Sequence, residues 1–132
     1  MSLTPGTIVR IHFGFYSHPG IVSDKKHDAM PMVISNSQRK RGVYEETWEE
    51  FCNGRPVDIL DYPGSLAPAE VLQRARSKIG TRWNLLTWNC EHFIRFAHGL
   101  KPRSPQVRAY AGCAVAIAGL AVLFSKGRSK AV

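Results

Sequence analysis

The spacing of apolar residues after Cys90 is the feature that most constrains how this chain folds. Phe93, Ile94 and Ala97 follow Cys90 at intervals of three, four and seven residues, which is the spacing of one face of an α-helix. Asn89, the residue before it, is among the side chains that favour the N-cap position of a helix. The pattern therefore predicts a helix that begins near Cys90 and turns the Cys90 side chain toward a core.

A cysteine in the first turn of a helix has a physical reason to be reactive. The backbone N–H groups and the positive end of the helix dipole stabilise a thiolate there. The alternative is a cysteine that is buried and only packs, which is common. His92 does not serve Cys90 as a base, because residues two apart on a helix do not face each other. We expect Glu91 and His92 to pack or to hydrogen-bond at the start of the helix, and a base for Cys90 to come from elsewhere.

The chain before this helix predicts a mixed α and β domain. Residues 7–13 alternate between apolar and polar side chains, as in a half-buried strand. The next extended run, residues 15–22, contains Pro19 and Gly20, so we expect an edge or bulged strand and not a central one. Two further short apolar runs cover residues 32–35 and 57–60.

Two helices are expected between these strands and Cys90. Thr47 and Glu50 have the T-x-x-E spacing of a capping box, which predicts a short helix that ends near Gly54. Residues 68–79 predict a longer helix that begins with a proline and stops at Gly80. Its apolar stripe consists of Val71, Leu72, Ala75 and Ile79.

Length and composition predict one domain with an appendage. With 132 residues, of which 44% are apolar, the chain can build one core of ordinary size. Its three cysteines form no C-x-x-C pair and no secretory leader is evident at Met1, so we expect a reducing compartment without disulfides. The formal charge is +8, and residues 101–132 carry six basic residues and no acid. We therefore separate a domain over residues 1–104 from a tail over residues 105–132.

The tail contains an uncharged apolar segment, residues 109–124. As a helix it would be about 24 Å long, somewhat short of the roughly 30 Å hydrocarbon core of a bilayer. Arg108 and Lys126, which bracket it, can extend toward lipid headgroups. Because the segment is apolar all round, we expect it to associate with a membrane; the alternative is a buried helix at the C-terminal end of the domain.

The best candidate for the base is His18, in the extended segment Y-S-H-P-G-I-V. A third polar residue is needed to orient its imidazole. In the later extended run M-V-I-S-N-S, Ser35 interrupts an apolar series, and Asn36 is the next residue, on the opposite strand face.

Several motifs together resemble the lecithin:retinol acyltransferase-like branch of the NlpC/P60 papain-like superfamily, which includes the H-Ras-like suppressor phospholipases. The N-C-E-H-F of residues 89–93 is similar to that branch's signature around its nucleophile. Upstream, A-R-S-K-I-G-T-R-W-N-L-L-T resembles the family's preceding helix and lead-in. P-G-T-I-V and H-P-G-I-V resemble its opening strand and its histidine motif. The resemblance covers residues 5–100, and the order histidine, polar residue, cysteine is the family's circularly permuted order.

The resemblance implies an α+β, permuted papain-like (NlpC/P60) fold, with a small antiparallel sheet packed on helices and followed by the C-terminal apolar helix. Carried onto this sequence, Cys90 is the nucleophile and His18 the general base and acid. Ser35 occupies the third position, where animal members commonly have a histidine. Asn36 is its substitute, because an amide can orient a histidine in papain-like sites.

The implied function is a thiol-dependent acyltransferase or phospholipase that acts on a phospholipid or another acyl ester through a thioester on Cys90. Two alternatives are a cysteine peptidase or amidase of the NlpC/P60 type and a membrane-tethered interaction module with weakened catalysis. The apolar tail, residues 109–124, is the expected membrane contact, on the cytoplasmic side. No cofactor is implied.

Metal and nucleic-acid binding are not expected. Cys90, Glu91 and His92 are too close in sequence to supply three ligands from one helical face. The basic run from Gln38 to Arg41 has no interleaved aromatic residues, so it predicts a solvated loop tip or a contact with phospholipid headgroups. His98, near a helix end, is expected to interact with the last carbonyls of that helix.

Overall fold

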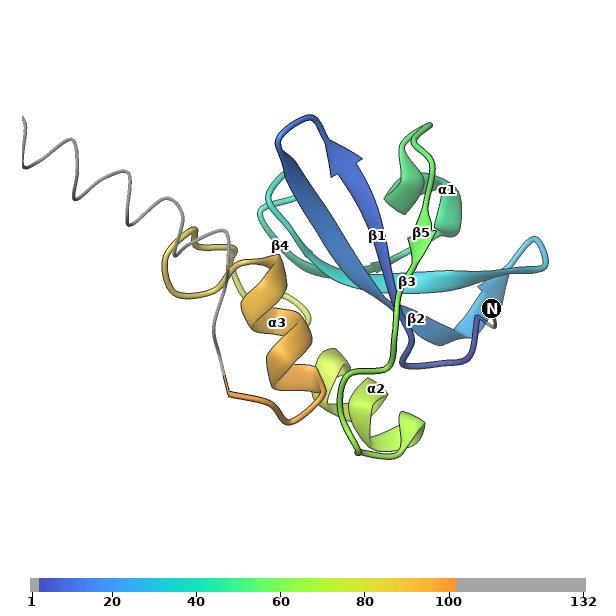
Figure 1. Cartoon of the computed structure of the whole chain (residues 1–132). Helices are drawn as coiled ribbons and strands as arrows, with labels where there is room; N and C mark the ends of the chain where they lie inside the picture. The colour runs from blue at the N-terminus through green and yellow to red at the C-terminus, as the bar shows by residue number, and fades with distance from the viewer. Residues whose placement is uncertain (1–2, 102–132) are drawn as a thin grey trace, which may run out of the picture.

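The alternating segments of the sequence form one antiparallel sheet of five strands, and three helices pack on it (Figure 1). The computed structural model describes residues 3–101. Across the sheet the strands lie in the order β4-β3-β2-β1-β5. The strands are β1 (Ile8–Phe13), β2 (Tyr16–His27), β3 (Met30–Ser37), β4 (Gly42–Glu46) and β5 (Asp58–Ile59); the helices are α1 (Trp48–Cys52), α2 (Pro68–Arg76) and α3 (Cys90–Ala97). The expected α+β class with a small antiparallel sheet is confirmed.

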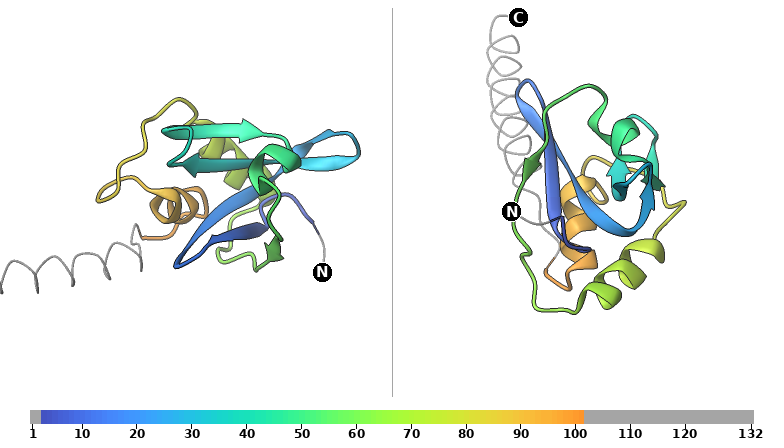
Figure 2. Two further views of the ribbon diagram at one scale, coloured as in Figure 1. Left: turned by 90° about the horizontal axis from the view of Figure 1, so that it is seen from above. Right: turned by 90° about the vertical axis from the view of Figure 1, so that its right-hand side faces the viewer.

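Apolar side chains cover both faces of the sheet, and helices bury each face (Figure 2). On one face, Ile8, Ile21 and Ile34 lie side by side in paired register on β1, β2 and β3 and pack under α2 and α3. On the other face, Val22 and Phe51 belong to a second cluster under α1. Because successive side chains of a strand point to opposite faces, a strand buried on both faces lacks a simple polar alternation.

For the segment around Pro19, the expectation of an edge strand is wrong, but the expected irregularity is present, because the register of β2 against β3 shifts between Val22 and Lys26. β2 is the middle strand and pairs with both β1 and β3. The N–H of Val22 donates to the carbonyl of Thr7, at 2.9 Å, on the β1 side. By alternation, the nitrogen of Pro19 faces the β3 side, where the regular pairing begins only at Ile21. The missing N–H of Pro19 therefore removes no bond from the regular ladder.

Helix α1 starts with the capping box that the sequence predicts. The N–H of Glu50 donates to the hydroxyl of Thr47, and the Glu50 carboxylate accepts from the Thr47 N–H, both at 3.2 Å. Helix α2 ends at Arg76, three residues before the expected end, and Ile79 is exposed. Residues 77–80 form turns, so only Val71, Leu72 and Ala75 of the expected stripe reach the core.

The apolar segment 109–124, and with it the expected C-terminal helix and the boundary between residues 104 and 105, lies outside the described residues. Within residues 3–101, no helix has the length and apolar character needed to cross a membrane.

Candidate active site

Asn89 and His92 together cap the start of α3 and hold Cys90 at its first residue. The side-chain oxygen of Asn89 accepts the N–H groups of Glu91 and His92, at 3.0 and 3.2 Å. In return, the backbone N–H of Asn89 donates to Nδ1 of His92, at 3.1 Å. This is a capping box in which a histidine replaces the usual acid. The ring of His92 therefore fixes the helix start, and burial lowers its pKa despite the nearby Glu91 carboxylate.

The amide of Asn36 ties the end of β3 to the residues that precede Cys90. Its side-chain N–H₂ group donates to the carbonyls of Trp88, at 2.8 Å, and Asn89, at 3.2 Å. Asn36 is fully buried, and a buried amide left without these acceptors would cost on the order of 1–3 kcal/mol. Asn36 thus positions the loop before the cysteine. Its amide N–H₂ group bonds that loop and its oxygen has no hydrogen-bond partner among the described residues, so it does not orient His18 through a hydrogen bond.

His18 lies near the start of β2. Its ring contacts the side chain of Ser35, the residue before Asn36 in β3. Nε2 of His18 is 3.2 Å from the hydroxyl oxygen of Ser35, which is almost fully buried. On one side the imidazole packs against Phe51 of α1, with ring centroids 5.4 Å apart. Gly20 permits this approach of α1, because a Cβ at Gly20 would lie 2.8 Å from the Phe51 ring.

The environment of His18 keeps its imidazole neutral. Burial is the larger cause and the positive charge of Arg39 the smaller, and together they lower the pKa of His18 from 6.5 to about 4. A neutral imidazole can accept a proton, as a general base must. Its low pKa also makes it a weak base unless a negative charge forms beside it.

Cys90 and His18 both line one cavity of about 380 Å³, which we call the thiol cavity. The two residues come from α3 and β2 and are 72 positions apart in sequence. The other lining residues include Phe15 and Leu85, which are apolar, and Gln38, which has a side-chain amide. The remaining members are Tyr16, Trp83 and Asn89. No sequence pattern predicted Gln38 or Trp83 at this cavity, because the β3–β4 turn and the loop before α3 bring them there.

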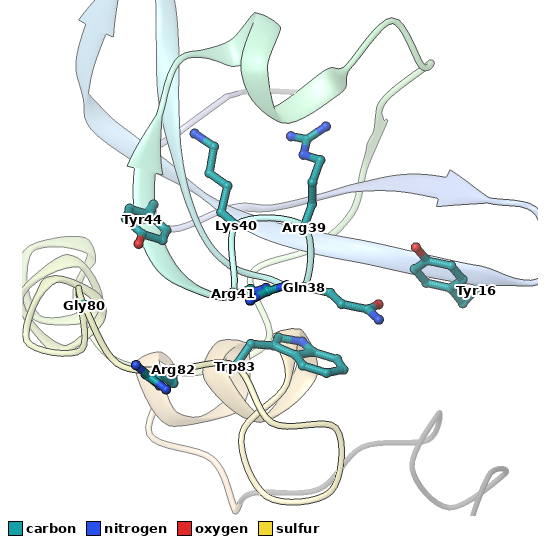
Figure 3. A pocket seen from close by; sticks show the side chains of 9 residues that line it. All are labelled: Tyr16, Gln38, Arg39, Lys40, Arg41, Tyr44, Gly80, Arg82 and Trp83. Atoms are coloured by element: carbon teal, nitrogen blue, oxygen red, sulfur yellow. The ribbon is translucent and has the colours of Figure 1, made fainter.

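A larger hollow of about 930 Å³, the basic hollow, adjoins the thiol cavity and shares Tyr16, Gln38 and Trp83 with it (Figure 3). Its cations are Arg39, Lys40, Arg41 and Arg82. In Figure 3 the side chains of Arg39 and Lys40 point away from Trp83. Both of them contact Glu50, Arg39 at its carbonyl and Lys40 at its carboxylate.

His98 is the C-cap residue of α3, as expected, and its backbone N–H donates to the carbonyls of Ile94 and Phe96. Its ring has a different partner: Nε2 donates to the carbonyl of Gly6, at 2.8 Å, across the domain. His98 is almost fully buried, and this burial lowers its pKa. His98 therefore joins the end of α3 to the segment before β1. Within residues 3–101, no cluster of three or more His, Cys, Asp or Glu side chains could hold a metal ion.

The cavity thus brings together a thiol at a helix start and a neutral imidazole, and Ser35 lies at hydrogen-bonding distance from that imidazole. These are the groups that nucleophilic acyl transfer requires. The family model for lecithin retinol acyltransferase matches residues 2–99. The chain therefore belongs to the lecithin retinol acyltransferase family, and this membership indicates an enzyme of the acyltransferase or phospholipase type. A comparison with curated proteins gave no match.

The lowered pKa of His18 predicts that the free energy of unfolding depends on pH. In the unfolded chain this imidazole takes up a proton below about pH 6.5, but in the folded protein only near pH 4. The stability that it contributes is present above pH 6.5 and is lost as the pH falls toward 4, by on the order of 3 kcal/mol. The difference in unfolding free energy between wild type and His18→Gln, measured with urea, should shrink by this amount from pH 7 to pH 4.

The matched control is His27→Gln, which removes an exposed imidazole at the β2–β3 turn. A difference between wild type and His18→Gln that stays constant from pH 7 to pH 4 would contradict the neutral, buried state of His18.

Proposed function

We propose that the protein transfers or hydrolyses the acyl group of a lipid ester through a thioester on Cys90. The observation that carries the proposal is the shared cavity: Cys90 at the start of α3 and His18 on β2 line the same space, although they are far apart in sequence. The family membership supports the same class of reaction. The apolar residues at the cavity, Phe15 and Leu85, suit an acyl chain better than a peptide backbone.

The proposed reaction has two halves. In the first, His18 accepts the thiol proton of Cys90, and the thiolate attacks the ester carbonyl; the C–O bond breaks, and the imidazolium returns its proton to the leaving alkoxide. This forms the thioester. In the second, water or another nucleophile attacks the thioester while His18 takes its proton, and the thiol of Cys90 is restored as the acyl group leaves.

The ring nitrogens of His18 divide these tasks. Nε2 lies at hydrogen-bonding distance from Ser35, so Nδ1 is the nitrogen that we assign to proton exchange with Cys90. A thiolate beside the ring supplies the negative charge that an imidazolium in this buried position needs. Ser35 holds the ring in orientation but carries no charge, so it stabilises the imidazolium less than a carboxylate would.

The negative charge that develops on the substrate oxygen needs hydrogen-bond donors. The N–H groups of Glu91 and His92 are used within the cap, where they donate to Asn89. We assign the role to the backbone N–H of Cys90. The side-chain amide of Gln38, which also lines the thiol cavity, is the second donor that we assign.

The thioester is directly testable by intact-protein mass measurement. Wild-type protein incubated briefly with a phospholipid should gain the mass of one acyl chain, and Cys90→Ala should gain none. Cys52→Ala is the matched control and should form the adduct, because Cys52 lies at the end of α1, outside the thiol cavity. No adduct and no fatty acid release with any lipid ester would refute the proposal, and cleavage of peptide amides alone would indicate the amidase alternative.

The role of Ser35 is tested by Ser35→Ala. Loss of one neutral hydrogen bond of about 0.5–1.5 kcal/mol should lower kcat by about two- to tenfold with little change in KM, because the ring is misoriented but the substrate cavity is intact. Ser37→Ala is the control: this serine is also buried in β3, and its hydroxyl accepts the N–H of Lys40. If the kcat of Ser35→Ala equals that of wild type, a group other than Ser35 orients the imidazole of His18.

From the sequence alone, we further propose that residues 109–124 hold the protein at a membrane, on its cytoplasmic side. Deletion of residues 105–132 should then abolish the fraction of protein that resists extraction from membranes with alkaline carbonate. A resistant fraction that survives the deletion would show that the tail is not the anchor.

A further inference from the structure

Large apolar side chains are exposed on two segments that line the thiol cavity. Phe15, at the β1–β2 turn, is 89% exposed, and Leu86, in the loop before α3, is 62% exposed. Leu85, in the same loop, is 41% exposed and lines the thiol cavity. These residues come from two separate segments. Moving their side chains from water into an apolar medium would be favourable.

Hydrogen bonds within the loop that carries the two leucines hold its conformation. The N–H of Asn84 donates to the carbonyl of Trp88, at 2.7 Å, and the N–H of Trp88 donates back, at 3.0 Å. The side-chain oxygen of Asn84 accepts two further N–H groups, those of Leu86 and Thr87. In Figure 1 this loop is the yellow segment that leads into α3. Its leucines are therefore presented to solvent by a hydrogen-bonded turn.

Two arginines line the basic hollow, which adjoins the thiol cavity. Arg41 and Arg82 are 41 positions apart in sequence, but an isolated bridge between Gly42 and Arg82 and a 3.2 Å bond from the Trp83 N–H to the Arg41 carbonyl bring their backbones together. Both line the basic hollow (Figure 3). Neither forms an ion pair with a carboxylate of the described residues.

No carboxylate of the described residues lines the thiol cavity or the basic hollow. Like charges held side by side without a counter-charge repel each other, so the pair suits an anionic partner. An anionic bilayer can bind both features of this surface. Its negative phosphates lie at the surface, where the arginines can bind them, and its apolar layer lies just below, where the apolar side chains can enter. Lys40, in contrast, is already neutralised by Glu46 and Glu50.

We propose that the mouth of the thiol cavity is a docking surface for an anionic phospholipid bilayer. Phe15, Leu85 and Leu86 enter the boundary between headgroups and acyl chains, while Arg41 and Arg82 bind phosphate groups beside them. Docking in this orientation opens the thiol cavity toward the lipid. The proposal goes beyond the acyl-transfer reaction, since docking requires no chemistry at Cys90, and it uses none of the residues of the tail.

Binding of the full chain to vesicles of ether-linked phospholipids tests the docking surface without any ester to cleave. Arg41→Gln with Arg82→Gln should weaken partitioning into vesicles that contain phosphatidylglycerol by about 25-fold at low salt, about fivefold for each arginine, with little effect on phosphatidylcholine vesicles. Phe15→Ser with Leu86→Ser should weaken binding to both kinds of vesicle by about tenfold or more. Cys90→Ala should bind as wild type does, so a failure of the proposed reaction leaves this result unaffected.

A matched control carries Lys26→Gln and Met30→Ser at the β2–β3 hairpin, where a cation and an exposed apolar residue also lie together. Its binding should equal that of wild type. Hydrogen exchange separates docking from any binding by the tail: anionic vesicles should slow exchange at residues 14–16 and 84–88 and leave the β2–β3 turn unchanged. Equal exchange at residues 84–88 with and without vesicles, or equal partitioning of the arginine variant and wild type, would overturn the proposal.

Discussion

The candidate site depends on one buried amide. Asn36 joins the end of β3 to the two residues before Cys90, which are more than fifty positions away in sequence. Its neighbour Ser35 points to the other side of the strand and meets His18. One strand segment thus positions both the helix that carries the thiol and the ring that lines the same cavity. Because strand side chains alternate, two adjacent polar residues can serve two partners on opposite sides of the sheet.

Burial gives His18 two opposing properties. It keeps the imidazole neutral near physiological pH, with a pKa of about 4, so that the ring can accept a proton. Burial also destabilises the imidazolium that forms when the ring accepts a proton. A negative charge next to the ring would stabilise this imidazolium, and in the proposed reaction the thiolate of Cys90 supplies that charge. The uncharged partner Ser35 adds orientation with little electrostatic support.

The two hollows differ in chemistry because different segments line them. The thiol cavity has apolar walls from the β1–β2 turn and the loop before α3. The basic hollow is formed by the β3–β4 turn and by the same loop. Tyr16, Gln38 and Trp83 are common to both. Under the proposed function, an amphiphile with an acyl ester and a phosphate would meet an apolar wall and a basic wall in adjoining hollows.

The sequence by itself determined the local elements and the candidate reactive residues. Apolar spacing placed α3, the T-x-x-E pattern placed the start of α1, and a helix start identified Cys90, because these signals arise from residues within one or two turns of each other. Only the tertiary structure decided that β2 is the middle strand, that Asn36 holds the loop before Cys90 while Ser35 meets His18, and that His98 reaches Gly6. It also placed Gln38 and Trp83 at the thiol cavity and Arg41 beside Arg82. Each of these depends on strand order and register, which pairing between distant segments sets and which local periodicity does not encode.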